Sequence, residues 1–272
     1  MIIDTHGQLF TTEFYEKVKN GEIEGLDMMG YASFFKEDVK DTVADMDQAG
    51  VDKSVVVAID AETKRGYKIS NELVAEAVKT YPDRLIGFAS VDPHKGKLAL
   101  EELEYAIEEL GLQGLKFIPH LIDLCPNDEL MYPIYEKANK YKIPVLLHSG
   151  THFHLGCKIK YNKPEYIDEI AVDFPQVNFI MAHFGYPWFY EGLAVAQKNF
   201  NVYFNLAGWA PQYIPEPVIK LMDSILSHKA LFGSDHPLLP RKRVLDELRQ
   251  LNIKESTLQK LTEENPKTIL NL

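Results

Sequence analysis

Short apolar runs alternate along the chain with segments in which apolar residues recur at helical spacing. Most of the runs are continuously apolar, as in the stretch from Val55 to Ile59. Strands of this kind are buried on both faces, as in a parallel sheet that helices cover on both sides. Eight runs occur, at residues 1–4, 53–59, 84–91, 112–118, 143–148, 177–183, 201–206 and 230–235. The pattern therefore predicts eight parallel strands.

Helical periodicity fills the gaps between these runs. Val39, Val43 and Met46 share one face of a helix, and Gly50 follows where a left-handed glycine commonly ends one. Helices are predicted at residues 34–50, 70–81, 97–111, 128–142, 164–174, 187–199, 214–228, 241–251 and 256–270. Residues 187–199 also fit an active-site loop, and the aperiodic stretches 11–34 and 151–163 are predicted to be loops over the strand ends.

The alternation of strand and helix predicts an α/β protein with a single domain over residues 1–272. No Gly/Ser-rich linker or solenoid repeat divides the chain. The length suits one (β/α)8 TIM barrel, which accounts for eight strands better than an open doubly wound sheet does. The dinucleotide-binding pattern GxGxxG is also absent after the first strand.

Composition narrows the classes of partner. The net charge is −11, from 40 acidic and 29 basic residues, which disfavours nucleic acid and anionic membranes. The two cysteines form no CxxC motif, and no secretory leader or long apolar span is visible. We therefore expect a cytoplasmic protein that acts on a small molecule.

Polar residues that suit metal binding end several of the predicted strands. His6, His148, His183 and Asp235 follow the first, fifth, sixth and eighth runs. The active site of a parallel barrel lies at these carboxyl ends, so closure of the barrel would bring the four together. Imidazole and carboxylate favour a divalent ion such as zinc, with manganese as an alternative. Zinc-bound water has a pKa of about 7, so such a site yields hydroxide near neutral pH.

Each histidine also has a structural interpretation. A lone histidine after a strand is more often a satisfied packing or loop residue than a ligand. We expect this structural role for His94, His120, His152, His154 and His228, although His152 and His154 lie in a loop that can touch substrate. For His6, His148 and His183 it is the weaker interpretation, because a buried strand end suits histidine poorly unless something binds it.

Other polar residues near the strand ends have open roles. Asp235 either serves catalysis or caps the next helix. Lys116 is a structural ion-pair partner, a substrate contact or, when carboxylated, a bridge between two metals. Trp209 either packs as a lid or shapes a substrate pocket. Arg241 either binds a substrate carboxylate or starts a solvated helix.

The strand-end motifs together resemble the amidohydrolase superfamily, specifically its amidohydrolase-2 branch of metal-dependent hydrolases and decarboxylases. They are Gly114-Leu115-Lys116-Phe117, Leu147-His148-Ser149-Gly150, Ala182-His183-Phe184-Gly185 and Phe232-Gly233-Ser234-Asp235-His236-Pro237. The resemblance implies that His6 and His148 are metal ligands and that Asp235 binds the metal or its water. It makes His183 a general acid/base or a further ligand. It also implies one divalent ion and a possible homodimer.

One position departs from the branch, which usually shows Asp-x-His-x-His. Gln8 stands where the second histidine belongs. An amide oxygen is a weaker ligand than imidazole for zinc. Three outcomes are open. Gln8 binds the metal through its amide oxygen, a water or another residue takes its place as a ligand, or the metal site is degraded.

Three functions follow as hypotheses. The leading one is metal-dependent hydrolysis of a lactone, amide or cyclic amide, in which Asp235 or His183 moves the proton. The alternative is non-oxidative decarboxylation on the same scaffold, with His183 or Asp235 protonating carbon. The third is a non-catalytic barrel that acts as a binding or assembly protein. The glutamine at position 8 is the only feature that supports this hypothesis.

Overall fold

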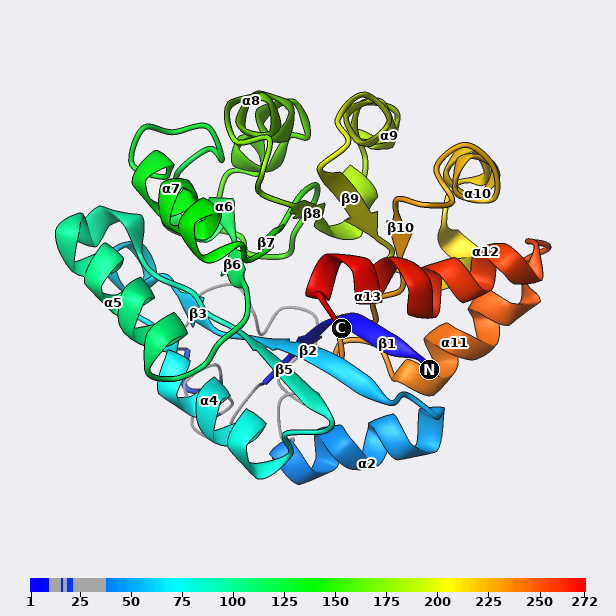
Figure 1. Ribbon diagram of the computed structural model, residues 1–272, viewed down its shortest axis with the longest axis horizontal. Coiled ribbons are helices and arrows are strands. Elements are labelled where there is room, and N and C mark those ends of the chain that lie inside the picture. Colours follow the sequence, from blue (N-terminus) through cyan, green and yellow to red (C-terminus); the bar gives the residue numbers. More distant parts are fainter. Residues whose placement is uncertain (10–15, 17–18, 22–37) are drawn as a thin grey trace.

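The chain forms the predicted ring of parallel strands. The computed structural model describes residues 1–9, 16, 19–21 and 38–272, and Figure 1 shows helices surrounding the strands. Within these residues the main strands are β1 (Ile3–Gln8), β2 (Lys53–Val57), β5 (Leu85–Phe88), β6 (Leu115–Phe117), β7 (Val145–Leu147), β8 (Phe179–Met181), β9 (Val202–Asn205) and β10 (Ala230–Leu231). All their pairings are parallel.

Two parallel sheets close into one barrel. Their strand orders are β1-β2-β5 and β10-β9-β8-β7-β6. A bridge between Ala89 and Leu115 joins β5 to β6, and a bridge between Gly7 and His236 joins β1 to the segment after β10. The amide nitrogen of Thr5 also donates to the carbonyl oxygen of Phe232 at 3.0 Å. The predicted TIM barrel is therefore confirmed.

The helices form the outer layer. They are α2 (Val39–Ala49), α4 (Asn71–Thr80), α5 (Lys97–Glu108), α7 (Tyr132–Tyr141), α8 (Glu165–Asp173), α9 (Phe189–Lys198), α10 (Glu216–Met222), α11 (Arg241–Gln250), α12 (Glu255–Gln259) and α13 (Asn265–Leu270). Asp38 caps α2 in a capping box, and Gly50 ends it at φ 70°, as its position predicted. Residues 34–37 of that predicted helix, and most of the predicted loop 11–34, lie outside the described residues.

Several predicted bounds differ from the structure. The first strand runs on to Gln8, so His6 and Gln8 lie inside β1. Gln8 pairs with Val57 of β2, and Gly7 bridges to His236 after β10. The helix predicted over residues 187–199 is confirmed as α9, and only the alternative of an active-site loop is wrong. The predicted helix 214–228 ends at Met222. Local periodicity locates elements well, but ladder pairing decides where strands stop.

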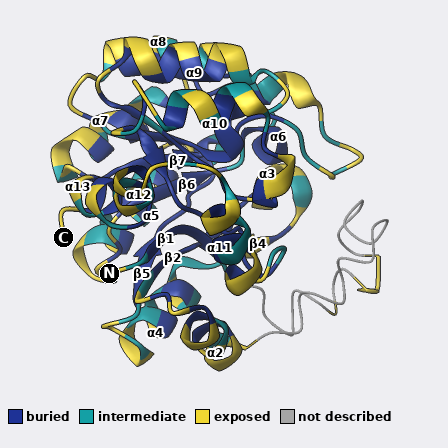
Figure 2. Ribbon diagram, turned by 90° about the vertical axis from the view of Figure 1, so that its right-hand side faces the viewer, coloured by how far each residue is buried: buried dark blue, intermediate teal, exposed yellow. Residues whose placement is uncertain are grey.

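Apolar side chains fill two layers. Ile3, Val55, Phe88 and Leu146 belong to the cluster inside the barrel, which Ile269 of α13 joins. A larger cluster lies between the strands and the surrounding helices. Figure 2 shows the strands buried and the outer faces of the helices exposed. No helix in the described part of the chain is long and apolar enough to cross a membrane.

Short extra elements lie in the connections that follow the strands. The hairpin β3 (Ile59–Asp60) and β4 (Lys68–Ile69) flanks the short helix α3 (Glu62–Arg65) after β2. The helix α6 (Pro119–Ile122) follows β6 directly. The predicted loop 151–163 contains the short 3-10 helix η4 (Ile159–Asn162) and otherwise has no regular structure. These segments surround the carboxyl ends of the strands.

Candidate metal centre and active site

Barrel closure brings together the side chains predicted to lie at the strand ends. His6 Nε2 lies 3.6 Å from Asp235 Oδ1. His183 Nε2 lies 3.1 Å from His148 Nδ1. The rings of His6 and His183 have centroids 5.4 Å apart. Side chains 229 positions apart in the sequence, His6 and Asp235, thus share one site at the mouth of the barrel.

Two carbonyl groups orient the His148–His183 pair. Thr151 O lies 3.0 Å from His148 Nε2, and Ala207 O lies 2.7 Å from His183 Nδ1, so each carbonyl accepts an N–H from its ring. In neutral imidazoles the other nitrogens then carry lone pairs. These are the two nitrogens that face each other at 3.1 Å. Two facing lone pairs repel unless a cation lies against them.

A proton is disfavoured as that cation. Burial lowers the pKa of His148, and the nearby His183 lowers it further. Burial also lowers the pKa of His183, although Asp235 opposes the shift. A divalent metal ion satisfies both lone pairs while the rings stay neutral, and this is the form in which histidine binds metal.

Lys116 lies against the same cluster from β6. Its Nζ is 3.1 Å from His6 Nε2, and the side chain is 1% exposed. Burial lowers the pKa of Lys116 to about 7, against an opposing contribution from Asp235. The pKa of His6 is lowered as well, mainly by burial and next by the positive charge of Lys116. His6 Nδ1 is buried without a hydrogen-bond partner, so its Nε2 is the nitrogen that faces the site.

Gln8 contacts Asp235 through its amide nitrogen. Gln8 Nε2 donates to Asp235 Oδ1 at 2.6 Å. An amide nitrogen is not a metal ligand, so ligation through oxygen would need a half-turn of the amide. In this arrangement Gln8 orients the carboxylate of Asp235.

Asp235 does not cap the following helix, because the residue before α11 at the cap position is Pro240. It has a positive φ of 62°, and His183 has one of 58°. A left-handed backbone is uncommon outside glycine and concentrates at functional sites. The neighbouring position 208 has room only for glycine, because a Cβ there would lie 2.9 Å from His183 Nδ1 and 3.1 Å from Asp235 Oδ2.

Arg241 is placed away from the substrate side. Its side chain is 0% exposed, and its Nε donates to Asp4 Oδ2 at 2.8 Å. Its other nitrogens donate to Asp45 Oδ1 at 3.1 Å and Ser54 Oγ at 3.0 Å. The predicted contact with a substrate carboxylate finds no support here, because all these donors are engaged inside the protein.

A cavity of about 240 Å³ opens beside the cluster. Gln8, His148, His183 and Asp235 reach it, and so does Trp209, whose ring packs 4.2 Å from that of Tyr186. Its other described lining residues are Ile59, Tyr67, Ile118, His120, Leu121, Thr151, His152, Phe153, His154, Gly208 and Leu238. Among the described residues, the lining contains no lysine or arginine. Lys116 lies beneath the cavity and not in its wall.

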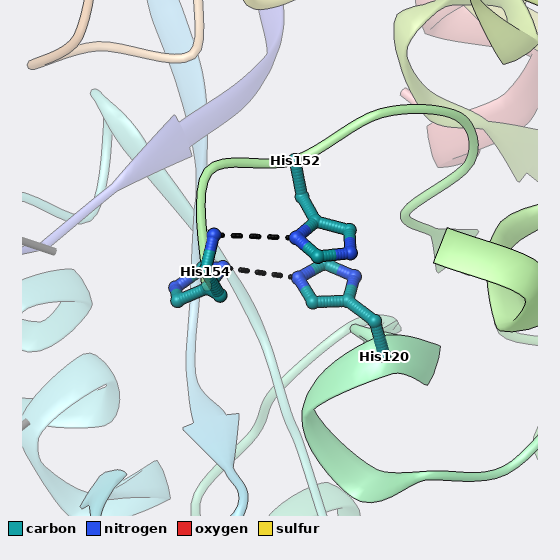
Figure 3. Close-up of side chains that lie close together, drawn as sticks. All are labelled: His120, His152 and His154. Carbon is teal, nitrogen blue, oxygen red and sulfur yellow. Dashed lines mark hydrogen bonds between the residues drawn. The ribbon is translucent and has the colours of Figure 1, made fainter. Parts of the chain in front are cut away.

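Three further histidines line this cavity, and the sequence did not predict their association. His120, at the start of α6, meets His152 and His154 from the loop after β7 (Figure 3). Their isolated positions in the sequence had favoured separate structural roles. His94 does fit that role, since its Nε2 lies 2.7 Å from Ile122 O. The i, i+2 spacing of His152 and His154 was the signal that could have indicated a shared site.

Comparison with known proteins shows the family to which the chain belongs. The amidohydrolase family profile matches residues 3–272. A 2-amino-3-carboxymuconate-6-semialdehyde decarboxylase from Dictyostelium discoideum is 30% identical over 78 residues, which are 29% of this chain and 22% of that protein.

Solved structures share the whole fold. An uncharacterised TIM-barrel protein from Bordetella bronchiseptica has a TM-score of 0.80 at 22% identity, covering 99% of this chain and 98% of its own. A 5-carboxyvanillate decarboxylase from Novosphingobium aromaticivorans, solved with manganese and 4-hydroxy-3-methoxy-5-nitrobenzoic acid, has a TM-score of 0.76 at 18% identity. The match covers 100% of this chain and 96% of that one.

The family profile sets aside the hypothesis of a non-catalytic barrel. The chain belongs to the amidohydrolase family, and the protein is a metal-dependent enzyme, either a hydrolase or a carboxy-lyase.

Proposed function

We propose that this enzyme is a metal-dependent, non-oxidative decarboxylase of a small unsaturated or aromatic carboxylic acid. The observation that carries the proposal is the cavity of about 240 Å³, which combines an apolar wall with a cluster of metal-binding side chains. An engineered cavity of about 150 Å³ is known to hold benzene, so a substituted ring fits this one. The decarboxylases found among the structural and sequence relatives support the same choice.

The metal would be held by His6, His148, His183 and Asp235. Three imidazoles and a carboxylate favour zinc, and manganese is the second choice. The facing lone pairs of His148 and His183 support a role for His183 as a ligand and not as the acid/base. When bound, the ion supplies the positive charge that binds the substrate carboxylate and stabilises the electron density left as CO2 departs.

The proton that replaces CO2 is assigned to Asp235. Its Oδ1 accepts from Gln8, whereas its Oδ2 lies close to Gly208, which has no side chain, and Asp235 and Gly208 both line the cavity. The carbon–carbon bond breaks with its electron pair left on the substrate carbon, and the proton from Asp235 Oδ2 forms the new C–H bond. Water then returns a proton to Asp235, so the reaction consumes one proton for each CO2 released.

The cavity wall helps to choose between the two reactions. Since its described lining offers no lysine or arginine, an anionic substrate depends on the metal for its charge partner. Ile118, Leu121 and Trp209 exclude water from the ring that must be protonated. A hydrolase instead needs water beside the scissile carbonyl. The apolar wall therefore favours decarboxylation over the hydrolysis of lactones or amides.

A product assay tests the proposal. The purified enzyme, loaded with zinc or with manganese, is incubated with 5-carboxyvanillate, other hydroxybenzoates and 2-amino-3-carboxymuconate-6-semialdehyde. We expect CO2 and a decarboxylated product that carries one deuterium when the reaction runs in D2O. A parallel panel of lactones and amides provides the comparison. Hydrolysis of that panel with no CO2 from any acid would establish the hydrolase instead.

A further inference from the structure

The second group of histidines is built differently from the first. The three side chains of His120, His152 and His154 each offer a ring nitrogen, and these nitrogens all lie within 4.8 Å of one another. His120 Nε2 is 3.1 Å from His154 Nδ1. The rings of His120 and His152 lie stacked, as Figure 3 shows. Their centroids are 3.7 Å apart. No acidic residue belongs to this group, so it offers three neutral donors.

One nitrogen in the group lacks a hydrogen-bond partner. His152 Nδ1 accepts the backbone N–H of His154 at 3.2 Å, which leaves the ring proton on Nε2. His152 Nε2 is buried without a partner. A protonated Nε2 is not a metal ligand, so the nitrogen that His152 offers to a cation is Nδ1, whose present partner is the backbone N–H of His154.

The amide of Asn162 can support the tautomer that a metal needs. Both its atoms reach His120 Nδ1, with Nδ2 at 2.9 Å and Oδ1 at 3.2 Å. When Oδ1 accepts a proton from Nδ1, the lone pair of His120 lies on Nε2 and faces His154. Ligating histidines are commonly oriented by such a hydrogen bond on their other nitrogen.

The remaining charges nearby permit a cation. The guanidinium of Arg65 approaches His120 O at 3.2 Å, but the same nitrogen also donates to Asp123 Oδ1 at 2.8 Å. The positive charge of Arg65 is thus offset locally. Burial lowers the pKa of His152 and of His154 to about 4, so both rings are neutral near pH 7.

We propose that His120, His152 and His154 form a second divalent-cation site, of the zinc or cobalt class, in the wall of the catalytic cavity. Three imidazoles suit these ions, and a fourth position stays open toward the cavity. The ring of His148 lies beside that of His120, with centroids 4.7 Å apart, and faces the first cluster with its Nδ1. The two sites are therefore neighbours that share no ligand. A cation here would supply positive charge that the described lining lacks.

Metal stoichiometry tests the second site without reference to turnover. The full-length protein is stripped with a chelator, titrated with Zn²⁺ or Co²⁺, separated from free metal and analysed by mass spectrometry. We expect two equivalents for the wild type. His154→Ala and His152→Ala should each retain only the ion of the first site. His148→Ala should lose that ion and retain the ion of the second site. The visible spectrum of bound Co²⁺ should lose one component in His154→Ala.

A matched control is His228→Ala, which should bind two equivalents because His228 belongs to neither cluster. Thermal melting checks that each variant is folded, and His154→Asn replaces His154→Ala if that variant is not. A single equivalent in the wild type that persists in a folded His154 variant would overturn the second site. So would two equivalents that both persist, or both vanish, in a folded His154 variant.

Discussion

At the residue scale, the site depends on how single atoms are oriented. His148 and His183 each give an N–H to a backbone carbonyl, and this leaves their lone pairs facing each other. Asp235 receives an amide proton from Gln8 on one oxygen. We therefore propose that Gln8, which departs from the family pattern, positions the carboxylate of Asp235.

Gly208 leaves little room for a side chain beside the site. Gly208→Ala would place a methyl group 2.9 Å from His183 Nδ1 at a φ of 74°. The left-handed backbone alone costs about 1–2 kcal/mol for a residue with a Cβ. Displacement of His183 and Asp235 should lower kcat by about 100-fold.

The control for this substitution is Gly50→Ala at the end of α2. Gly50 has a φ of 70°, and a Cβ there would meet nothing within 4 Å. Both variants should lose stability in urea unfolding, Gly208→Ala the more because of its close contact, while only Gly208→Ala should lose turnover. Equal activity in the two variants would show that the close contact at Gly208 does not matter.

At the element scale, one buried ion pair ties the first strand to the last barrel helix. Arg241 starts α11 and bonds Asp4 of β1. Asp4 also accepts from the amide nitrogen and the hydroxyl of Ser234, at 2.9 Å and 2.6 Å. This network sets β1 against the segment that carries Asp235, so it positions His6 and Asp235 without touching the cavity.

Arg241→Ala should destabilise the protein by about 3–5 kcal/mol, because it leaves Asp4 buried and unpaired. The matched control on the same helix is Arg243→Ala, which breaks the exposed pair with Glu247 at 2.8 Å and should change stability by less than about 1 kcal/mol. Urea unfolding measures both. If Arg241 bound substrate instead, the variant would raise KM and leave the unfolding midpoint nearly unchanged.

At the scale of the whole molecule, the metal would join distant parts of the barrel. His6 comes from β1, His148 and His183 follow β7 and β8, and Asp235 follows β10. These strands belong to two different sheets that meet only at the barrel seams. An ion bound by all four side chains therefore stabilises closure of the barrel as well as serving the reaction.

Removal of the metal should lower thermal stability. At a concentration 100-fold above Kd, a ligand that binds only the folded state adds about 2.7 kcal/mol. For a protein of this size that corresponds to a loss of roughly 5–10 °C in Tm on chelation. Calorimetry with and without chelator measures the shift, and readdition of zinc should reverse it. His148→Ala should show a smaller shift, and an unchanged wild-type Tm would contradict the assignment.

The order of the elements could be predicted from the sequence alone, because the local periodicity of apolar residues indicates which segments are strands and which are helices. The same holds for His6, His148, His183 and Asp235, since parallel strands place their carboxyl ends on one face. The expected homodimer and the cytoplasmic location remain predictions.

Tertiary structure decided what depends on neighbours far away in the chain. Arg241 was predicted either to bind a substrate carboxylate or to start a solvated helix, but the pairing of β1 with the segment after β10 encloses it beside Asp4. His120, His152 and His154 looked like three isolated residues, and only the approach of α6 to the loop after β7 makes them one group. Local sequence determines which residues end a strand, whereas the partners of a side chain depend on the packing of segments that the sequence separates.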